Sequence, residues 1–390
     1  MNIVILSTSP FPDGNASSTY MLNVCRTMVA CGHNVTVIGC RRTLKTDFPL
    51  NGEFEGIKYL NFDATAHNKL VMYAYNLHFE VFAKSFLRKL NGTDIVFLYG
   101  NTVPVAESVK RYCRRKNIKF GAFDCEWYTE ECFAPGVSKR HIKGTVGHIP
   151  HMAQNADAAI LISTMLTDYF KENGVHSVMI PNIVDFADEK WNVKKAAVAD
   201  GKLKIAYAGV PGVGKDELGV AVKAIGELPE DKRSNTELHV YGPDEKGLLA
   251  YLKTQDLDAI PPYVICHGRQ KQNEIPAKLN ECHFTVLIRK PTRRANAGFS
   301  TKMVESFAAG IPFIANITGD IATYLKDGEN GIVVSDESVE ACRDALVRAW
   351  EMLDKNPEMR KKAYKTAEDN FDCKLYVGVM KDFLATIPQS

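Results

Sequence analysis

Short apolar runs that alternate with longer stretches of helical period are the feature that most restricts the fold of this chain. In the first half the runs fall at residues 3–6, 35–38, 94–99, 119–123, 158–162 and 178–180. In the second half they fall at residues 203–208, 238–241, 264–266, 284–288, 312–315 and 332–334. Runs this short, bounded by Gly, Pro, Asn or Asp, are typical of buried parallel strands. The pattern therefore predicts an α/β fold with two doubly wound parallel sheets.

The length agrees with two domains, because 390 residues exceed the roughly 100–200 that one domain usually holds. A polar, charged stretch without a clean period separates the two sets of runs, and we interpret it as a linker. We predict an N-terminal domain at 1–183, a linker at 184–202, a C-terminal domain at 203–368 and a last helix at 369–390 that packs back on the first domain. In this arrangement two Rossmann-like domains face each other across a cleft.

Composition excludes several classes of function. The chain has 48 Lys and Arg against 46 Asp and Glu, so its net charge of +2 does not indicate a nucleic-acid partner. Its ten cysteines form no C-x-x-C pair and match no zinc spacing, and we expect no metal and no bound cofactor. The start of the chain does not resemble a signal peptide, and no apolar run approaches the ~18 residues of a membrane span. We expect a cytoplasmic protein.

Residues 289–315 are the segment that most strongly suggests chemistry. Ser300 is placed to cap a helix over 301–309, so the free backbone N–H groups at its start can meet a phosphate. Glu305 lies one turn further along the same helix face as Thr301. A carboxylate at that distance from a diphosphate can accept hydrogen bonds from a ribose diol. The alternative is an ordinary capped helix with a solvated Glu–Lys pair.

Several segments together resemble a known family. Residues 298–312 read Gly-Phe-Ser-Thr-Lys-Met-Val-Glu-Ser-Phe-Ala-Ala-Gly-Ile-Pro, followed by Gly-Asp-Ile at 319–321 and Asp-Gly-Glu-Asn-Gly at 327–331. They closely resemble the donor-nucleotide segment of retaining GT-B glycosyltransferases of the large family four, the group 1 type. Residues 32–39 and 180–185 agree in order and spacing. The resemblance covers nearly the whole chain and implies a sugar nucleotide in the second domain and an acceptor mainly in the first.

By this resemblance Glu305 holds the ribose and its neighbours line the donor site. Those neighbours are Gly298, Phe299, Ser300, Thr301 and Lys302. The family has a further glutamate eight residues before Glu305, but position 297 is alanine. A group that contacts the sugar hydroxyls is therefore missing, which leaves the identity of the donor sugar open.

The glycine turn at 209–215 resembles a second part of the donor site. The family places an arginine after Gly209 and a lysine five residues later, both on the diphosphate. Here Lys215 is present, but Val210 replaces the arginine. The lost charge can come from the loop that follows the strand at 284–288, which holds Arg289, Arg293 and Arg294. We expect Lys215 and Arg289 to stabilise the leaving diphosphate, with Arg294 among the donor-binding residues.

Three further candidates follow from the same resemblance. Gly14 and Asn15 belong to a loop whose backbone would approach the donor; the alternative is a simple turn in which Ser17 or Ser18 caps a helix. Glu126 follows a strand on the acceptor side and can act on the acceptor hydroxyl. Its alternative is an ordinary surface acid. Arg269 follows a strand near the expected position of the base and phosphate.

The expected function is transfer of a sugar from a UDP- or GDP-linked donor to a saccharide or lipid-linked saccharide, as in cell-surface polysaccharide or glycoconjugate synthesis. Two alternatives stay open. The run from Gly209 to Lys215 satisfies G-x-x-x-x-G-K and suggests a nucleotide hydrolase, although Asp216 stands where Ser or Thr should hold magnesium. A binding protein that has lost catalysis is the other. Basic stretches at 84–89, 110–116 and 139–143 allow peripheral contact with an anionic membrane, and Phe82, Phe86 and Leu87 lie beside the first of them.

Overall fold

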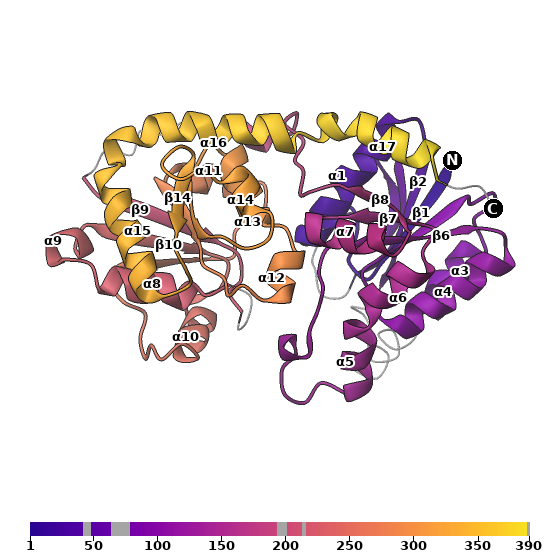
Figure 1. Cartoon of the computed structure of the whole chain (residues 1–390), viewed down its shortest axis with the longest axis horizontal. Helices are drawn as coiled ribbons and strands as arrows, with labels where there is room; N and C mark the ends of the chain where they lie inside the picture. Colours follow the sequence, from indigo (N-terminus) through magenta and orange to yellow (C-terminus); the bar gives the residue numbers. More distant parts are fainter. Residues whose placement is uncertain (42–47, 64–78, 193–200, 213–215, 388–390) are drawn as a thin grey trace. The chain divides into compact units, whose positions relative to one another are not determined.

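The chain consists of two compact α/β units, each built around one sheet (Figure 1). The computed structural model describes residues 1–41, 48–63, 79–192, 201–212 and 216–387. The first unit comprises Met1–Ile183 and Cys373–Ser390, and the second comprises Val184–Asp372. Residues 184–192, which we had assigned to the linker, are part of the second unit. Val184 bridges to Asp372, and Trp191 is buried.

The first unit has an eight-stranded sheet in the order β3-β4-β2-β1-β5-β6-β7-β8. Its strands are β1 (Asn2–Ser7), β2 (Asn34–Arg41), β3 (Asn51–Phe54), β4 (Ile57–Asp63), β5 (Ile95–Tyr99), β6 (Lys119–Asp124), β7 (Ala158–Leu161) and β8 (His176–Met179). All neighbours pair in parallel except β3 and β4, which form an antiparallel hairpin. The hairpin adds two strands at one edge of the sheet, with β3 outermost, to the six that the apolar runs predict.

The helices of the first unit include the last helix of the chain. They are α1 (Ala16–Ala30), α3 (Phe79–Leu87), α4 (Val103–Arg115), α5 (Lys139–Val146), α6 (His148–Asn155), α7 (Thr164–Glu172) and α17 (Tyr376–Ala385), with short 3-10 turns η1 (Glu130–Cys132) and η4 (Cys373–Leu375). Helix α17 lies against α1 and β8 (Figure 1). It buries Met380, Phe383 and Leu384 there, because these residues lie three, four or one positions apart and share one helix face.

The second unit has a six-stranded, fully parallel sheet in the order β11-β10-β9-β12-β13-β14. Its strands are β9 (Leu203–Ala208), β10 (Thr236–Tyr241), β11 (Val264–Gly268), β12 (Phe284–Leu287), β13 (Phe313–Asn316) and β14 (Gly331–Val334). All six lie where the apolar runs of the second half predict strands, with ends that differ by one or two residues. Because β12 and β13 are buried on both faces, and β9 and β14 nearly so, their runs are nearly continuous and easy to recognise.

Helices separate these strands, as the β/α pattern predicts. They are α8 (Leu218–Gly226), α9 (Glu230–Arg233), α10 (Glu245–Lys253), α11 (Ile275–Asn280), α12 (Arg293–Ala297), α13 (Thr301–Ala308), α14 (Ile321–Tyr324), α15 (Val339–Glu351) and α16 (Asn356–Phe371), with 3-10 turns η2 (Glu189–Trp191) and η3 (Leu353–Lys355). Of the helices within the described ranges, none is both long and apolar enough to cross a membrane.

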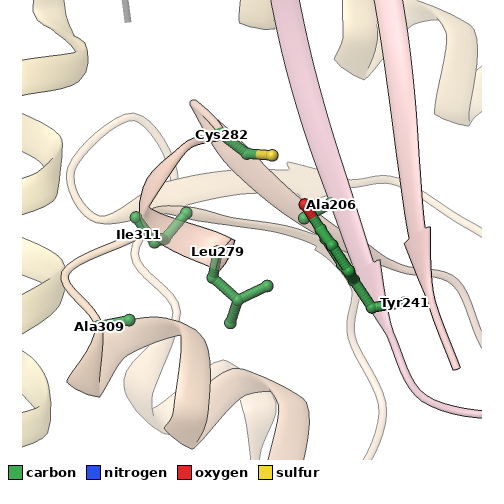
Figure 2. Packing of buried hydrophobic residues seen from close by; sticks show 6 residues of the cluster. All are labelled: Ala206, Tyr241, Leu279, Cys282, Ala309 and Ile311. Atoms are coloured by element: carbon green, nitrogen blue, oxygen red, sulfur yellow. The ribbon is translucent and has the colours of Figure 1, made fainter. Parts of the chain in front are cut away.

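One apolar cluster shows how helices pack on this sheet (Figure 2). Ala206 of β9 pairs with His239 of β10, and Tyr241 lies two positions after His239 in the same strand. Ala206 and Tyr241 therefore lie on the same face of the sheet. Leu279 of α11 packs against them. The remaining members, from the segments that follow α11 and α13, are Cys282, Ala309 and Ile311. The cluster fixes α11 and the end of α13 to β9 and β10 of the sheet that carries the candidate site.

Candidate functional site

The strand order of the second unit creates a switch point at β9, which has β10 on one side and β12 on the other. The chain leaves β9 toward one half of the sheet and later returns to the other half at β12. Connections on the two sides therefore diverge, and ligands of open α/β sheets bind in the resulting crevice at the carboxyl ends of the strands. Asp216 follows β9 and Arg289 follows β12, so both lie at this edge.

A buried carboxylate joins two cations there. Asp216 is 1% exposed. Its Oδ1 accepts a hydrogen bond from Arg289 Nε at 2.8 Å, and its Oδ2 accepts one from Lys302 Nζ at 2.8 Å. The Tyr207 hydroxyl also donates to Oδ2, at 2.9 Å. We call Asp216, Arg289 and Lys302 the charge cluster. Both cations are among the site residues predicted from the sequence, whereas Asp216 was noted only because it stands where Ser or Thr should hold magnesium.

The charge cluster carries a net positive charge. Burial alone would raise the pKa of Asp216, but the charges of Lys302 and Arg289 outweigh it and hold that pKa well below its usual range. Asp216 is therefore ionised at neutral pH, and two cations share one anion. The remaining charge of +1 suits an anionic ligand. Because the carboxylate is already shared by two cations and is buried, it is a poor candidate for a magnesium ligand.

Arg289 is fixed at both its backbone and its side chain. Asn316, at the end of β13, accepts from the Arg289 N–H at 2.9 Å and donates to its carbonyl oxygen at 2.7 Å. The guanidinium is held through Nε alone. Within the described residues its two terminal nitrogens make no hydrogen bond. Those nitrogens form the fork that matches two phosphate oxygens.

Glycines let the loops after β9 and β10 pack closely beneath Lys302. Gly209 has φ +143°, and a Cβ there would lie 2.8 Å from Lys302 Cε. Gly242 has φ +147°, and a Cβ there would lie 2.2 Å from the Gly209 carbonyl oxygen. No other residue type fits either place without moving its neighbours. The predicted role of Gly209 in donor binding is untested, but its place beside the charge cluster is clear.

The predicted helix start at residues 300–302 is present. Ser300 is the N-cap of α13, and its side chain accepts a hydrogen bond from the Met303 N–H at 3.2 Å, which confirms the predicted cap. Thr301 is the first helical residue and is partly exposed. The backbone N–H of Lys302 makes no hydrogen bond within the described part of the chain. The start of α13 thus offers a backbone donor beside two cationic side chains.

Glu305 lies one turn into α13 and is partly exposed. Burial raises its pKa, and Lys190 and Lys302 oppose that rise only in part. Its carboxylate makes no hydrogen bond or ion pair with any described residue. It is available as an acceptor for a ligand on the same helix face as Thr301.

The segment before α13 forms a helix of its own. Arg293 and Arg294 begin α12, which Gly298 ends. Ala297 is fully buried, so no side chain points from that position to a ligand. Phe299 is also buried and packs against the rings of Tyr324 and Phe371. The ring of Phe299 therefore supports α13 from inside the unit.

One predicted donor residue, Arg269, is not brought to the charge cluster by any described contact. Arg269 is exposed directly after β11, the edge strand two positions from β9. Lys215 lies outside the described residues, so its predicted role stays a prediction. Val210, which replaces the expected arginine, is 71% exposed and forms part of no core.

In the first unit, a side chain of β4 fixes the loop that follows β1. Asn61 of β4 exchanges two hydrogen bonds with the backbone of Phe11. Gly14 has φ +156° and is partly exposed. Asn15, and neither Ser17 nor Ser18, is the N-cap of α1: its side chain accepts from the Ser18 N–H at 3.0 Å. The Asn15 side chain is thus engaged in the capping box, which leaves mainly the backbone of this loop for a ligand.

Glu126 lies after β6, where it was expected. It is partly exposed and accepts a hydrogen bond from the Tyr128 hydroxyl. The preceding strand, β6, ends at Asp124, which contacts a histidine of α6 that the sequence pattern did not connect with it. His148 Nε2 lies 2.9 Å from Asp124 Oδ1, and both side chains are buried. Asp124 Oδ2 and His148 Nδ1 have no hydrogen-bond partner among the described residues.

The fold and the site together define a class: a chain of two doubly wound α/β units, the second with a net positive charge cluster at its switch point. Residues 202–352 match the family model of the glycosyl transferases group 1. The matched segment spans β9 to α15 and contains the whole charge cluster. This confirms the prediction that the chain is a glycosyltransferase. No curated protein sequence matches the chain.

Solved structures extend the likeness to the whole chain. Sucrose-phosphate synthase from Thermosynechococcus elongatus has a TM-score of 0.72 at 14% identity, with 99% of both chains covered. Anabaena HepE in complex with UDP and glucose has a TM-score of 0.68 at 15% identity, with 99% of this chain and 100% of that chain covered. WaaG, a glycosyltransferase involved in lipopolysaccharide biosynthesis, has a TM-score of 0.68 at 14% identity, with 98% and 100% covered. The predicted GT-B fold is confirmed.

Proposed function

We propose that the chain transfers a sugar from a nucleotide diphosphate sugar to a saccharide or lipid-linked saccharide, with retention at the anomeric carbon. The observation that supports this most is the charge cluster. It places two cations and one carboxylate, with a net charge of +1, at the switch point of a glycosyltransferase domain, beside the N-terminus of α13. A diphosphate is the ligand that such a combination suits.

In the proposed reaction the bond between the anomeric carbon and the β-phosphate oxygen breaks, and negative charge develops on the leaving diphosphate. The terminal nitrogens of Arg289, the Lys302 ammonium and the start of α13 stabilise that charge. Glu305 accepts hydrogen bonds from the ribose diol. The acceptor oxygen forms the new bond on the face that the diphosphate leaves, and its proton passes to the diphosphate. We propose Glu126 as the residue that orients the acceptor hydroxyl, and Lys215 as a further cation.

The donor is proposed to carry uridine, since HepE has been solved with UDP and glucose. No resident metal or cofactor enters the proposal, because fixed cations take the part that a divalent ion would have.

A lipid-linked acceptor would fit the basic residues of α5, Lys139, Arg140 and Lys143, which are exposed. The structure removes one argument for membrane contact, since Phe86 packs against Phe62 and Leu87 is buried. Cosedimentation with anionic vesicles tests that contact; the Phe82 side chain lies outside the described residues.

Thermal-shift measurements with UDP, GDP, ADP and their sugars test the donor site. We expect one nucleotide to raise the melting temperature of the wild type. Glu305→Ala and Lys215→Ala should reduce that rise, while Lys361→Ala on the exposed face of α16 should not. The proposal fails if no nucleotide stabilises the wild type. Stabilisation without sugar transfer to any acceptor would favour a binding protein, and magnesium-dependent phosphate release without sugar would favour a hydrolase.

A further inference from the structure

Asp216 is the most buried member of the charge cluster, and the two cations it joins are more exposed. The side chains of Arg289 and Lys302 are 11% and 18% exposed, against 1% for Asp216. A ligand that enters from solvent therefore meets the cations and not the carboxylate. A phosphate could take the place of Asp216 only if the carboxylate moved out of its buried position, and protein encloses that position on its other sides.

Two buried tyrosines contact Asp216 from the protein side, one at its carboxylate and one at its backbone. Tyr207 is 1% exposed and donates to Asp216 Oδ2, and its ring also lies under Lys302 Nζ, 5.2 Å from the nitrogen. Tyr251 donates to the Asp216 carbonyl oxygen at 3.1 Å and accepts from the Gly219 N–H at 3.3 Å. Burial keeps the pKa of Tyr207 well above its usual value, so its hydroxyl stays a donor. The Asp216 carboxylate is thus held by the Tyr207 hydroxyl, which is buried with it, whereas the Tyr251 hydroxyl contacts backbone groups only.

We propose that Asp216 is a positioning residue: it holds Arg289 through Nε and Lys302 through Nζ, so that both cations are already in place when the donor diphosphate arrives. The inference rests on the proposed function. Long Lys and Arg side chains lose much rotamer freedom when they bind, and a carboxylate that has already ordered them removes part of that loss. Holding Arg289 through Nε also leaves its terminal fork for the phosphate.

A purely electrostatic role of Asp216 predicts the opposite change in diphosphate affinity when the carboxylate is removed. If Asp216 only lowered the charge of the site, its removal would raise the net charge from +1 to +2 and tighten diphosphate binding. If Asp216 positions the cations, removal leaves two like charges side by side with nothing to hold them apart or in place. Binding then weakens although the site becomes more positive. The direction of the change therefore separates the two roles.

Isothermal titration of the full chain with UDP, GDP and ADP, each with and without its sugar, provides the test. For the ligand that the wild type binds, we expect Asp216→Asn to weaken binding by about tenfold. Kcat should fall as well, because the same cations face the leaving group. Tyr207→Phe keeps every charge and removes only one hydrogen bond to the carboxylate, so it should weaken binding by about two- to fivefold.

Tyr251→Phe is the matched control. It removes a buried hydroxyl of the same kind, but one that bonds only to backbone groups of Asp216 and Gly219 and not to the carboxylate, and it should bind the ligand as the wild type does. Tyr207→Phe also keeps the test decisive if Asp216→Asn does not fold. Binding by Asp216→Asn or Tyr207→Phe that equals or exceeds that of the wild type would overturn the positioning role alone. A wild type that binds none of the nucleotides would overturn the proposed function and this inference with it.

Discussion

Asp216 and Glu305 show how differently two carboxyl groups of one unit titrate. Burial acts to raise the pKa of both groups. Asp216 has two cations within hydrogen-bond distance, which outweigh burial and lower its pKa, whereas Glu305 has none among the described residues and its pKa is raised. Asp216 therefore contributes stability above the pKa of an unfolded Asp, and this is lost as the pH falls through its lower folded value. For Glu305 the sign is reversed: the folded state takes up a proton more readily, so ionisation as the pH rises costs stability.

The raised pKa of Glu305 predicts a pH-dependent donor affinity. Only the carboxylate can accept hydrogen bonds from both ribose hydroxyls, so affinity for the nucleotide sugar should fall as the pH drops through the pKa of Glu305. The midpoint should lie above the ordinary value of about 4.3 for Glu. The two phosphates of a nucleotide sugar keep their charges in this range and add no titration of their own. Isothermal titration across mildly acidic to neutral pH measures the effect.

Glu305→Gln is the control for this titration. It keeps the shape of the side chain and removes the ionisation, so its affinity should be lower at neutral pH and constant across the acidic range. An acidic loss of affinity in Glu305→Gln that matches the wild type would assign the titration to another group. A midpoint at or below the ordinary value of Glu would contradict the effect of burial.

Single residues of the site were predictable only as far as their local pattern reaches. Glu305 and Ser300 follow from helix spacing and capping, which are local rules. The partners of Asp216 are 73 and 86 residues away, so nothing near it in the sequence reveals a shared carboxylate. The Asp124–His148 pair was missed for the same reason, because it joins the end of a strand to a helix that begins 24 residues later.

At the scale of elements, the start of α13 and the start of α15 form a natural comparison. Both helices belong to the second unit and both have a serine N-cap: Ser300 accepts from the Met303 N–H at 3.2 Å, and Ser338 accepts from the Ala341 N–H at 3.1 Å. Ser300→Ala and Ser338→Ala should each lower the free energy of unfolding by about 1 kcal/mol. Urea unfolding measures that loss.

Only the cap of α13 should also matter for the ligand. Ser300 orders the turn that carries Thr301 and Lys302, so Ser300→Ala should weaken nucleotide binding, whereas Ser338→Ala should leave it unchanged. Equal affinities in the two variants would mean that the start of α13 is a stabilising helix end and no part of the donor site.

Elements were predictable where burial makes a continuous apolar run. That condition holds for β9, β12, β13 and β14 of the second sheet and for the inner strands of the first. It fails for β3, whose residues are exposed or only partly buried, and for β4, where buried Ile57 and Tyr59 alternate with less buried residues. A hairpin at a sheet edge leaves one side open to solvent, and its pattern is too weak to distinguish from a loop.

At the scale of the whole chain, the sequence predicts where one unit ends but not how the last segment is divided. The predicted first domain ends at residue 183, and the first of the two segments that form the first unit ends at Ile183. The predicted linker and final helix differ more: residues 184–192 and 369–372 belong to the second unit. The interval from 369 to 390 reads as one helical stretch, but α16 ends at Phe371 and α17 begins at Tyr376.

Helix α17 should be a structural part of the first unit, and Phe383 is one of the buried residues that hold it there. Its side chain is 5% exposed, its ring stacks on that of His176 at 4.9 Å, and its carbonyl oxygen lies 3.0 Å from His176 Nε2. Phe383→Ala should therefore destabilise the first unit by about 3–5 kcal/mol. Hydrogen exchange should quicken in α1 and β8, with the six-stranded sheet as an internal reference.

Val379, on the same helix, is the matched control because its side chain is 43% exposed. Val379→Ala should change stability by no more than about 0.5 kcal/mol, since it removes methyl groups from water and not from a core. If α17 were only a tail resting on the surface, Phe383→Ala and Val379→Ala would have the same small effect. A large loss confined to Phe383→Ala would show that the first α/β unit needs the end of the chain to complete its core.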